Sequence, residues 1–260
     1  MPELQNYRDL ACNECLHGAG LGFEFTMAFQ PIVDVSSRTI FAHESLVRGL
    51  GNQPASSVFQ HVNDSNRYAF DQACRVKAVN LAARLNMTSI LSINFMPNAV
   101  YRPELCIRTT LAAAKEFGFP AERIMFEVTE SERVADIAHL RSIFHHYQEI
   151  GFTTALDDFG AGFSGLNLLA ELDVNILKLD MYLIRDIDKN NRKYAIVKGV
   201  TTACQELGIT VIAEGVETQT ELKALRGLGI KLFQGFLFAR PAYESLAEVN
   251  WERALSQAGF

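Results

Sequence analysis

The sequence predicts an α/β fold, a (β/α)8 TIM-like barrel with an antiparallel first strand. The length of 260 residues fits one such barrel. Eight short apolar segments alternate with segments of helical spacing, a pattern typical of parallel strands joined by helical crossovers. Only residues 36–38 separate the first two strand candidates. Because a parallel crossover needs many more residues, these two strands must form a hairpin, and one of them must run against the rest.

The strand candidates are short runs rich in apolar, β-branched or aromatic residues. In chain order they are Thr26–Val35, Thr39–Val47, Ile90–Phe95, Ile124–Thr129, Thr153–Asp158, Asn175–Asp180, Thr210–Glu214 and Lys231–Phe238. The helix candidates are Ala69–Leu85, Pro103–Phe117, Ser131–Ile150, Met181–Leu207, Thr218–Leu228 and a last segment from Tyr243 to about Gln257. Four of the helix candidates end just before a glycine, which is a common helix stop.

The chain shows no long linker, low-complexity segment or internal repeat. We therefore expect one barrel domain over residues 23–260, preceded by an N-terminal appendage over residues 1–22. The polar N-terminus and the lack of an apolar run of about 20 residues predict no membrane segment. An odd number of cysteines, five, favours a reducing cytoplasm over a disulfide framework. A net charge of −6 argues against a nucleic acid polymer as the partner.

Polar residues interrupt the apolar runs where the strands end, and in such a barrel these ends share one mouth. They are Glu44, Asn94, Glu127, Asp157, Asp158, Lys178, Glu214 and Gln234. A single glutamate at a strand end is more often solvated or half of an ion pair. Five carboxylates at one mouth, however, repel one another unless cations are present.

Oxygen ligands, with the Asn94 amide among them, suit magnesium, manganese or calcium better than zinc. The adjacent Asp157 and Asp158 can bridge two such ions, an arrangement used for in-line displacement at phosphorus. The residues therefore predict a metal-dependent phosphodiesterase site.

Short phrases along most of the chain also resemble a known family. In order they are FQPI (29–32), ESL (44–46), FEVTE (126–130), DDFGAG (157–162), LKLD (177–180), AEGVE (213–217), QG (234–235) and ARP (239–241). They resemble the EAL domain, the bacterial phosphodiesterase that linearises cyclic di-GMP. The resemblance implies a barrel with an antiparallel first strand, in agreement with the hairpin. It also implies hydrolysis to pGpG, which lowers this second messenger, and a homodimer.

The resemblance implies roles for individual residues. Glu44, Asn94, Glu127 and Asp157 match the ligands of a first metal, and Asp157, Asp158 and Glu214 match those of a second. The implied cofactors are two Mg²⁺ or Mn²⁺ ions, with Ca²⁺ inhibitory. Catalytic roles fall to Lys178, which holds or deprotonates the attacking water, to Glu214, and to Glu130, which steadies the loop after the aspartate pair. The remaining matches are residues near the substrate or metals: Gln30, Arg48 and Gln234.

Three positions depart from the common pattern of the family. Ser45 replaces an alanine, Met96 replaces a serine near Asn94, and Ala161 replaces a threonine in the loop after the aspartates. The alternative is therefore a catalytically impaired EAL domain that acts as a cyclic di-GMP receptor or as a protein-interaction module. The retention of every matched metal ligand favours hydrolysis. Outside the barrel, Cys12, Cys15 and His17 either begin a zinc site or belong to a partly buried N-terminal segment.

Overall fold

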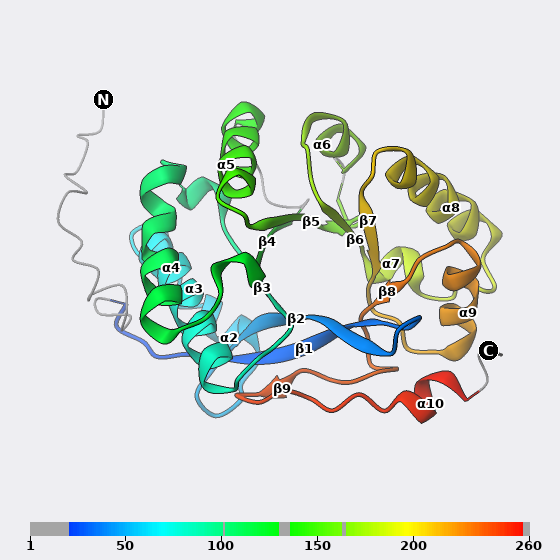
Figure 1. Ribbon diagram of the computed structural model, residues 1–260, viewed down its shortest axis with the longest axis horizontal. Helices are drawn as coiled ribbons and strands as arrows, with labels where there is room; N and C mark the ends of the chain where they lie inside the picture. Colours follow the sequence, from blue (N-terminus) through cyan, green and yellow to red (C-terminus); the bar gives the residue numbers. More distant parts are fainter. Residues whose placement is uncertain (1–20, 101, 130–135, 163–164, 257–260) are drawn as a thin grey trace.

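The computed structural model describes residues 21–100, 102–129, 136–162 and 165–256. Eight of its strands close into a barrel, viewed in Figure 1 with the helices arranged around it. The strands are β1 (Thr26–Asp34), β2 (Thr39–Arg48), β3 (Ile90–Asn94), β4 (Ile124–Thr129), β5 (Thr153–Phe159), β6 (Ile176–Leu179), β7 (Thr210–Ala213) and β8 (Leu232–Phe233). The expected α/β barrel is confirmed.

The first strand runs against its neighbours, as the short connection predicts. β1 pairs antiparallel with β2, with Gln30 opposite Glu44, and antiparallel with β8, with Val33 opposite Phe233. The pairs from β2 through β8 are parallel. A short β9 (Ala242–Tyr243) adds to the first half of β1, where β8 has already ended.

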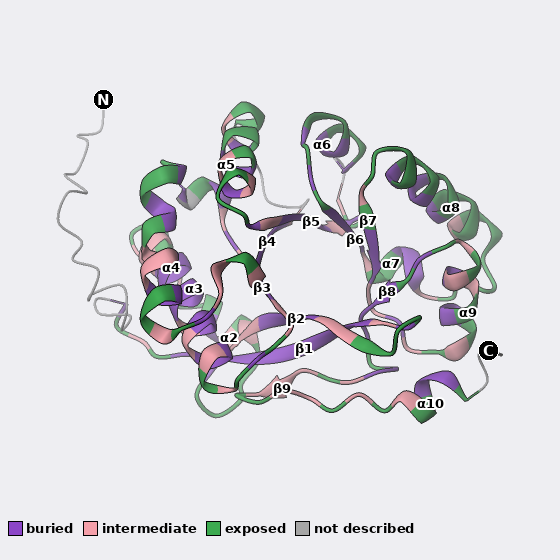
Figure 2. Ribbon diagram, in the orientation of Figure 1, coloured by how far each residue is buried: buried purple, intermediate pink, exposed green. Residues whose placement is uncertain are grey.

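The helices lie outside the barrel, with their apolar faces turned toward it and their exposed faces outward (Figure 2). The longer ones are α3 (Arg67–Arg84), α4 (Pro103–Phe117), α5 (Ile137–Glu149), α8 (Asn191–Glu206) and α9 (Gln219–Gly227). The shorter ones are α2 (Ala55–Phe59), α6 (Gly165–Glu171), α7 (Met181–Ile184), α10 (Trp251–Leu255) and the 3₁₀ turns η2 (Pro97–Ala99) and η3 (Ala121–Arg123). None of the described helices combines the length and apolar character that a membrane span requires.

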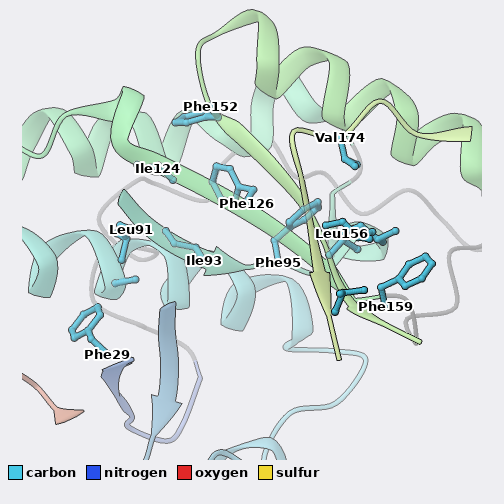
Figure 3. Close-up of a cluster of buried hydrophobic side chains, with 14 of the residues drawn as sticks. Phe29, Leu91, Ile93, Phe95, Ile124, Phe126, Phe152, Leu156, Phe159 and Val174 are labelled. Atoms are coloured by element: carbon cyan, nitrogen blue, oxygen red, sulfur yellow. The ribbon is translucent and has the colours of Figure 1, made fainter. Parts of the chain in front are cut away.

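Two apolar layers result from the alternation of side chains along the strands. A large cluster fills the space between the strands and the helices, and Figure 3 shows part of it, including Phe95, Phe126 and Phe152. A smaller cluster fills the barrel interior; its buried members are Ile32, Ala42, Met125, Ala155, Ile176, Ile212 and Leu232. These interior residues form the floor beneath the strand ends.

The segment Met181–Leu207 was predicted as one helix, and this is wrong. The structure divides it into α7 and α8 because Asp186 adopts a left-handed conformation with φ 56°. The Asn190 side chain then accepts hydrogen bonds from the backbone of Arg192 and Lys193, which starts α8 as a new helix.

The C-terminal predictions also need correction. The expected helix from Tyr243 is limited to α10, because Tyr243 pairs with β1 and Asn250 caps the later helix start. The strand expected over Lys231–Phe238 is regular only at its second and third residues, Leu232 and Phe233. Its ladder is continued by single hydrogen bonds, from Val35 N to Lys231 O and from Gln234 N to Ala213 O. The proposed appendage over 1–22 lies almost wholly outside the described residues.

Candidate metal centre

Strand register brings the predicted polar residues together at one mouth of the barrel. In most strands an interior apolar residue lies two positions before a polar one, so both side chains point to the same side. The pairs are Ala42 with Glu44, Met125 with Glu127, Ala155 with Asp157, Ile176 with Lys178, Ile212 with Glu214 and Leu232 with Gln234. In the reversed β1 the order is inverted, with Gln30 two positions before Ile32.

The Lys178 ammonium group lies at the centre of this mouth and is fully buried. Its Nζ atom is 2.7 Å from Glu214 Oε1, 2.9 Å from Glu127 Oε2 and 3.0 Å from Asp157 Oδ1. The Glu44 Oε2 atom is slightly farther away, at 3.6 Å. One cation thus faces four carboxylates, so the cluster retains an excess of negative charge whenever the carboxylates are ionised.

Two side-chain amides fix the orientation of Glu44. Asn94 Nδ2 donates to its Oε1 atom at 2.9 Å, and Gln234 Nε2 donates to its Oε2 atom at 2.8 Å. Since the Asn94 nitrogen is committed to Glu44, the amide oxygen is the atom that remains for a cation. Glu127 Oε1 is buried and has no hydrogen-bond partner among the described atoms, which is costly without a further ligand.

The protonation of these carboxylates reflects burial and mutual repulsion. Burial raises the pKa of Glu127, Asp157 and Glu214; in each case Lys178 opposes the shift, and a neighbouring carboxylate adds to it. The pKa of Asp158 rises to about 6, chiefly through burial and then through Asp157. The same carboxylates raise the pKa of Lys178 well above its usual value despite its burial. A buried acidic cluster of this kind favours occupation by divalent cations.

Among the described residues, two groups of carboxylates have ligand atoms close enough to hold one ion each. The first is Glu44, Glu127 and Asp157, and the second is Asp157, Asp158 and Glu214; within each group the atoms lie within 4.8 Å of one another. Asp157 belongs to both, so two ions held here would be neighbours. The all-oxygen donor set and the unpartnered Glu127 Oε1 atom both fit hard divalent cations.

The turn after β5 aims Asp158 into the mouth. Asp158 adopts φ 54°, and its backbone nitrogen donates to Asp157 Oδ1 at 2.8 Å. A left-handed non-glycine residue of this kind is uncommon and costs free energy. Because the regular alternation is broken here, adjacent aspartates can both face the cluster.

Cavities flank the cluster on two sides and share Glu44, Asp158 and Glu214 as lining residues. The larger, of about 440 Å³, is mostly apolar; its lining includes Met27, Phe59, Phe70, Phe95 and Met96. The smaller, of about 230 Å³, is more polar and is lined by residues that include Gln30, Asp180, Glu217, Gln234 and Phe236.

Not every predicted site residue reaches the cluster. Gln30 lines the smaller cavity, and its Nε2 atom donates to the Ala239 carbonyl at 3.3 Å. Arg48 is half-buried at the end of β2, where its Nη1 atom donates to the Val47 carbonyl at 2.7 Å, and it lines neither cavity. Glu130 lies outside the described residues, as do Cys12, Cys15 and His17.

Some residues around the site escaped the sequence reasoning. The Arg185 guanidinium binds both oxygens of Glu217, at 2.5 and 2.7 Å, and so orders one wall of the smaller cavity. Asp71 lines the larger cavity from α3, far from any strand end. The sequence analysis considered polar residues at strand ends, so it could not identify a helix residue such as Asp71.

Of the three positions that depart from the family pattern, Ser45 is accommodated in the structure, since its hydroxyl donates to the Ser92 carbonyl at 2.8 Å.

Comparisons with known proteins give a consistent result. The family model described as "EAL domain" matches residues 19–241. The antirepressor BluF of Escherichia coli is 31% identical over 225 residues, which are 86% of this chain and 56% of BluF. The cyclic di-GMP phosphodiesterase RocR of Pseudomonas aeruginosa is 30% identical over 230 residues, which are 85% of this chain and 58% of RocR. The chain thus spans little more than half the length of these two relatives.

Solved structures agree with the family match. A standalone EAL protein from Vibrio cholerae in its c-di-GMP-bound form is 54% identical, with a TM-score of 0.87 and coverage of 90% of this chain and 98% of that one. The manganese and cyclic di-GMP complex of BlrP1 from Klebsiella pneumoniae is 34% identical, with a TM-score of 0.82 and coverage of 88% and 58%.

Proposed function

The chain belongs to the EAL domain family, and from this premise we propose that it hydrolyses cyclic di-GMP to the linear dinucleotide pGpG with the help of two divalent cations. The observation that carries the proposal is the pair of carboxylate groups that share Asp157. Without cations this acidic mouth would repel a phosphodiester, whereas two bound ions would attract one.

The shape of the mouth fits a dinucleotide. A phosphodiester at the carboxylate cluster would leave one nucleoside on each side, where the two cavities lie. Among the aromatic residues of the larger cavity, the exposed ring of Phe59 suits a flat base. The smaller cavity offers the amides of Gln30 and Gln234 as hydrogen-bonding groups.

The roles of the chain's own residues follow from their positions. Bound cations would supply Lewis-acid activation and would neutralise developing charge on the phosphate. Glu44, Asn94, Glu127 and Asp157 would hold one ion, and Asp157, Asp158 and Glu214 the other. Lys178, whose Nζ atom lies among the carboxylates that would hold both ions, would orient the attacking water by hydrogen bonding.

The proposal is tested by incubating the purified protein with cyclic di-GMP and Mg²⁺ or Mn²⁺ and resolving the products by chromatography. We expect pGpG to form, formation to stop when a chelator is added, and Ca²⁺ not to support it. Asp157→Ala and Glu44→Ala should lower turnover by at least 100-fold, whereas Asp188→Ala, at an exposed position, should not. Turnover of either site variant within a few-fold of wild type would contradict the assignment.

A second candidate is a cyclic di-GMP receptor that binds without cleaving, and Met96 and Ala161 are the observations that favour it. Met96 lines the larger cavity, and the Ala161 nitrogen donates to the Asp158 carbonyl at 3.0 Å, in the turn that presents the aspartates. Binding of cyclic di-GMP without product, in the presence of Mn²⁺, would support this candidate over hydrolysis.

The proposal includes a cytoplasmic homodimer. The described cysteines Cys74, Cys106 and Cys204 are buried free thiols, and thiols of this kind suit a reducing compartment. Large apolar side chains are exposed on α7 and α8; they include Met181, Tyr182 and Ile196. These would suit self-association. Light scattering after size exclusion, compared with Tyr182→Asp and Ile196→Asp variants, tests the dimer.

A further inference from the structure

Arg75 on α3 is a charged side chain placed wholly inside the molecule. It is 0% exposed, and its Nη2 atom lies 2.6 Å from Asp71 Oδ2, one helical turn earlier. Asp71 is itself only 3% exposed. Buried ion pairs are a poor source of stability compared with apolar side chains of similar volume, because both charges lose their hydration. The placement of this pair therefore calls for another explanation.

The contacts of the pair join four elements. Arg75 Nη1 donates to the Tyr147 hydroxyl of α5 at 3.1 Å. Its Cζ atom lies 5.5 Å from the ring centre of Phe95 and 5.3 Å from that of Phe126. Asp71 Oδ1 accepts a hydrogen bond from the backbone nitrogen of Met96 at 2.9 Å. The pair thus connects α3 with α5, with β4 and with the segment that leaves β3.

The aromatic contacts lie directly behind the metal centre. Phe95 follows Asn94, and Phe126 precedes Glu127, so the rings face the helices while their neighbours face the mouth. Both rings belong to the buried layer seen in Figure 3, and they meet edge to face with centroids 5.9 Å apart. Asn94 and Glu127 are register partners, and the Phe95 nitrogen donates to the Glu127 carbonyl at 3.0 Å.

From this arrangement we propose that Asp71 and Arg75 are positioning residues that hold Asn94 and Glu127 in the geometry required to bind a divalent cation. Asp71 anchors the backbone two residues after Asn94, and Arg75 holds the two rings adjacent to the ligands. The inference rests on the proposed function, since it assigns the pair to the same metal centre. It adds a support that contacts neither cation: Arg75 lies on the helix side of the strands, and Asp71 lies in the wall of the larger cavity.

The test compares Mn²⁺ binding to the metal-free protein, measured by calorimetry, in three proteins. Asp71→Leu/Arg75→Met replaces the pair by apolar side chains of similar length and leaves no unpaired buried charge. Leu225→Ala is the control, because Leu225 is a buried residue of α9 on another part of the barrel. Truncating its side chain should lower the stability of the fold and leave the metal ligands in place. Thermal unfolding is recorded for each protein.

We expect the double variant to bind Mn²⁺ about 10- to 100-fold more weakly, with kcat lowered more than KM is raised, because ligand support of this kind has such an effect. The Leu225→Ala control should lose thermal stability and keep the wild-type affinity for Mn²⁺. A double variant that binds Mn²⁺ within twofold of wild type would overturn the inference.

Amide hydrogen exchange of the metal-free protein separates this inference from the proposed function. The double variant should exchange faster at residues 94–96 and 126–127 than wild type, and the control should not. Unchanged exchange there would refute the positioning role even if wild type hydrolyses cyclic di-GMP. A wild-type protein that neither binds Mn²⁺ nor forms pGpG would instead refute the proposed function. The inference would then fail as well, because it assigns the pair to the same metal centre.

Discussion

Replacing Lys178 by methionine tests whether this one cation holds the metal-free mouth together. At the 2.7 Å distance to Glu214, and with an effective dielectric of about 20, the gross attraction is about 6 kcal/mol. Desolvation of the buried ammonium offsets several kcal/mol of that, and removal of one partner from a buried pair typically costs about 3–5 kcal/mol. We expect a loss near the lower end, about 3 kcal/mol, because the carboxylates whose pKa burial raises can take up protons.

The assay is urea unfolding of wild type and Lys178→Met, in chelator and in excess Mn²⁺. Mn²⁺ at 100 times its Kd stabilises a protein by about 2.7 kcal/mol. The variant should gain more than wild type, since metal and ammonium no longer compete for the same carboxylates. Lys189→Met, which removes an exposed lysine paired with Asp186, is the control and should leave stability unchanged. Equal stability of Lys178→Met and wild type in chelator would refute the reasoning.

Three further predictions concern pH, backbone space and the unusual residues. In chelator, the free energy of unfolding should fall as pH rises, because a carboxyl whose pKa is raised in the folded state binds more protons there than in the unfolded state. For Asp158 the loss should fall between pH 4 and about 6 and amount to about 1–2 kcal/mol after solvent screening. Unfolding measured at a series of pH values tests this, and an increase in stability over the same range would contradict it. Gly235→Ala should destabilise the fold by about 1–3 kcal/mol, because a Cβ there would lie 2.1 Å from the Val216 carbonyl oxygen. It should also lower turnover, because the clash would displace the adjacent Gln234. Unchanged thermal unfolding of the variant would count against this prediction. Met96→Ser and Ala161→Thr should each raise kcat in a steady-state assay, because both positions depart from the family pattern beside the metal ligands; a kcat equal to that of wild type would contradict this.

The positioning pair escaped the sequence analysis for a physical reason. Asp71 and Arg75 lie four residues apart on α3, and this spacing is typical of an ion pair on the exposed face of a helix. Nothing in the spacing indicates that both side chains are buried. The break between α7 and α8 is a different case, because Asn190 is a recognisable helix-capping residue and could have been read as one.

The sequence by itself determined the barrel, its reversed first strand and the family, since these depend on local features: strand periodicity, the three-residue connection before Thr39 and the ordered short phrases. It also named the carboxylates that the structure gathers at one mouth, because the carboxyl ends of parallel strands share one edge. The tertiary structure decided what depends on register and burial: the place of Lys178 among four carboxylates, the amide contacts that orient Glu44, and the burial of Asp71 and Arg75 behind the metal ligands. These properties arise only when strands distant in the chain are set side by side, so no local pattern encodes them.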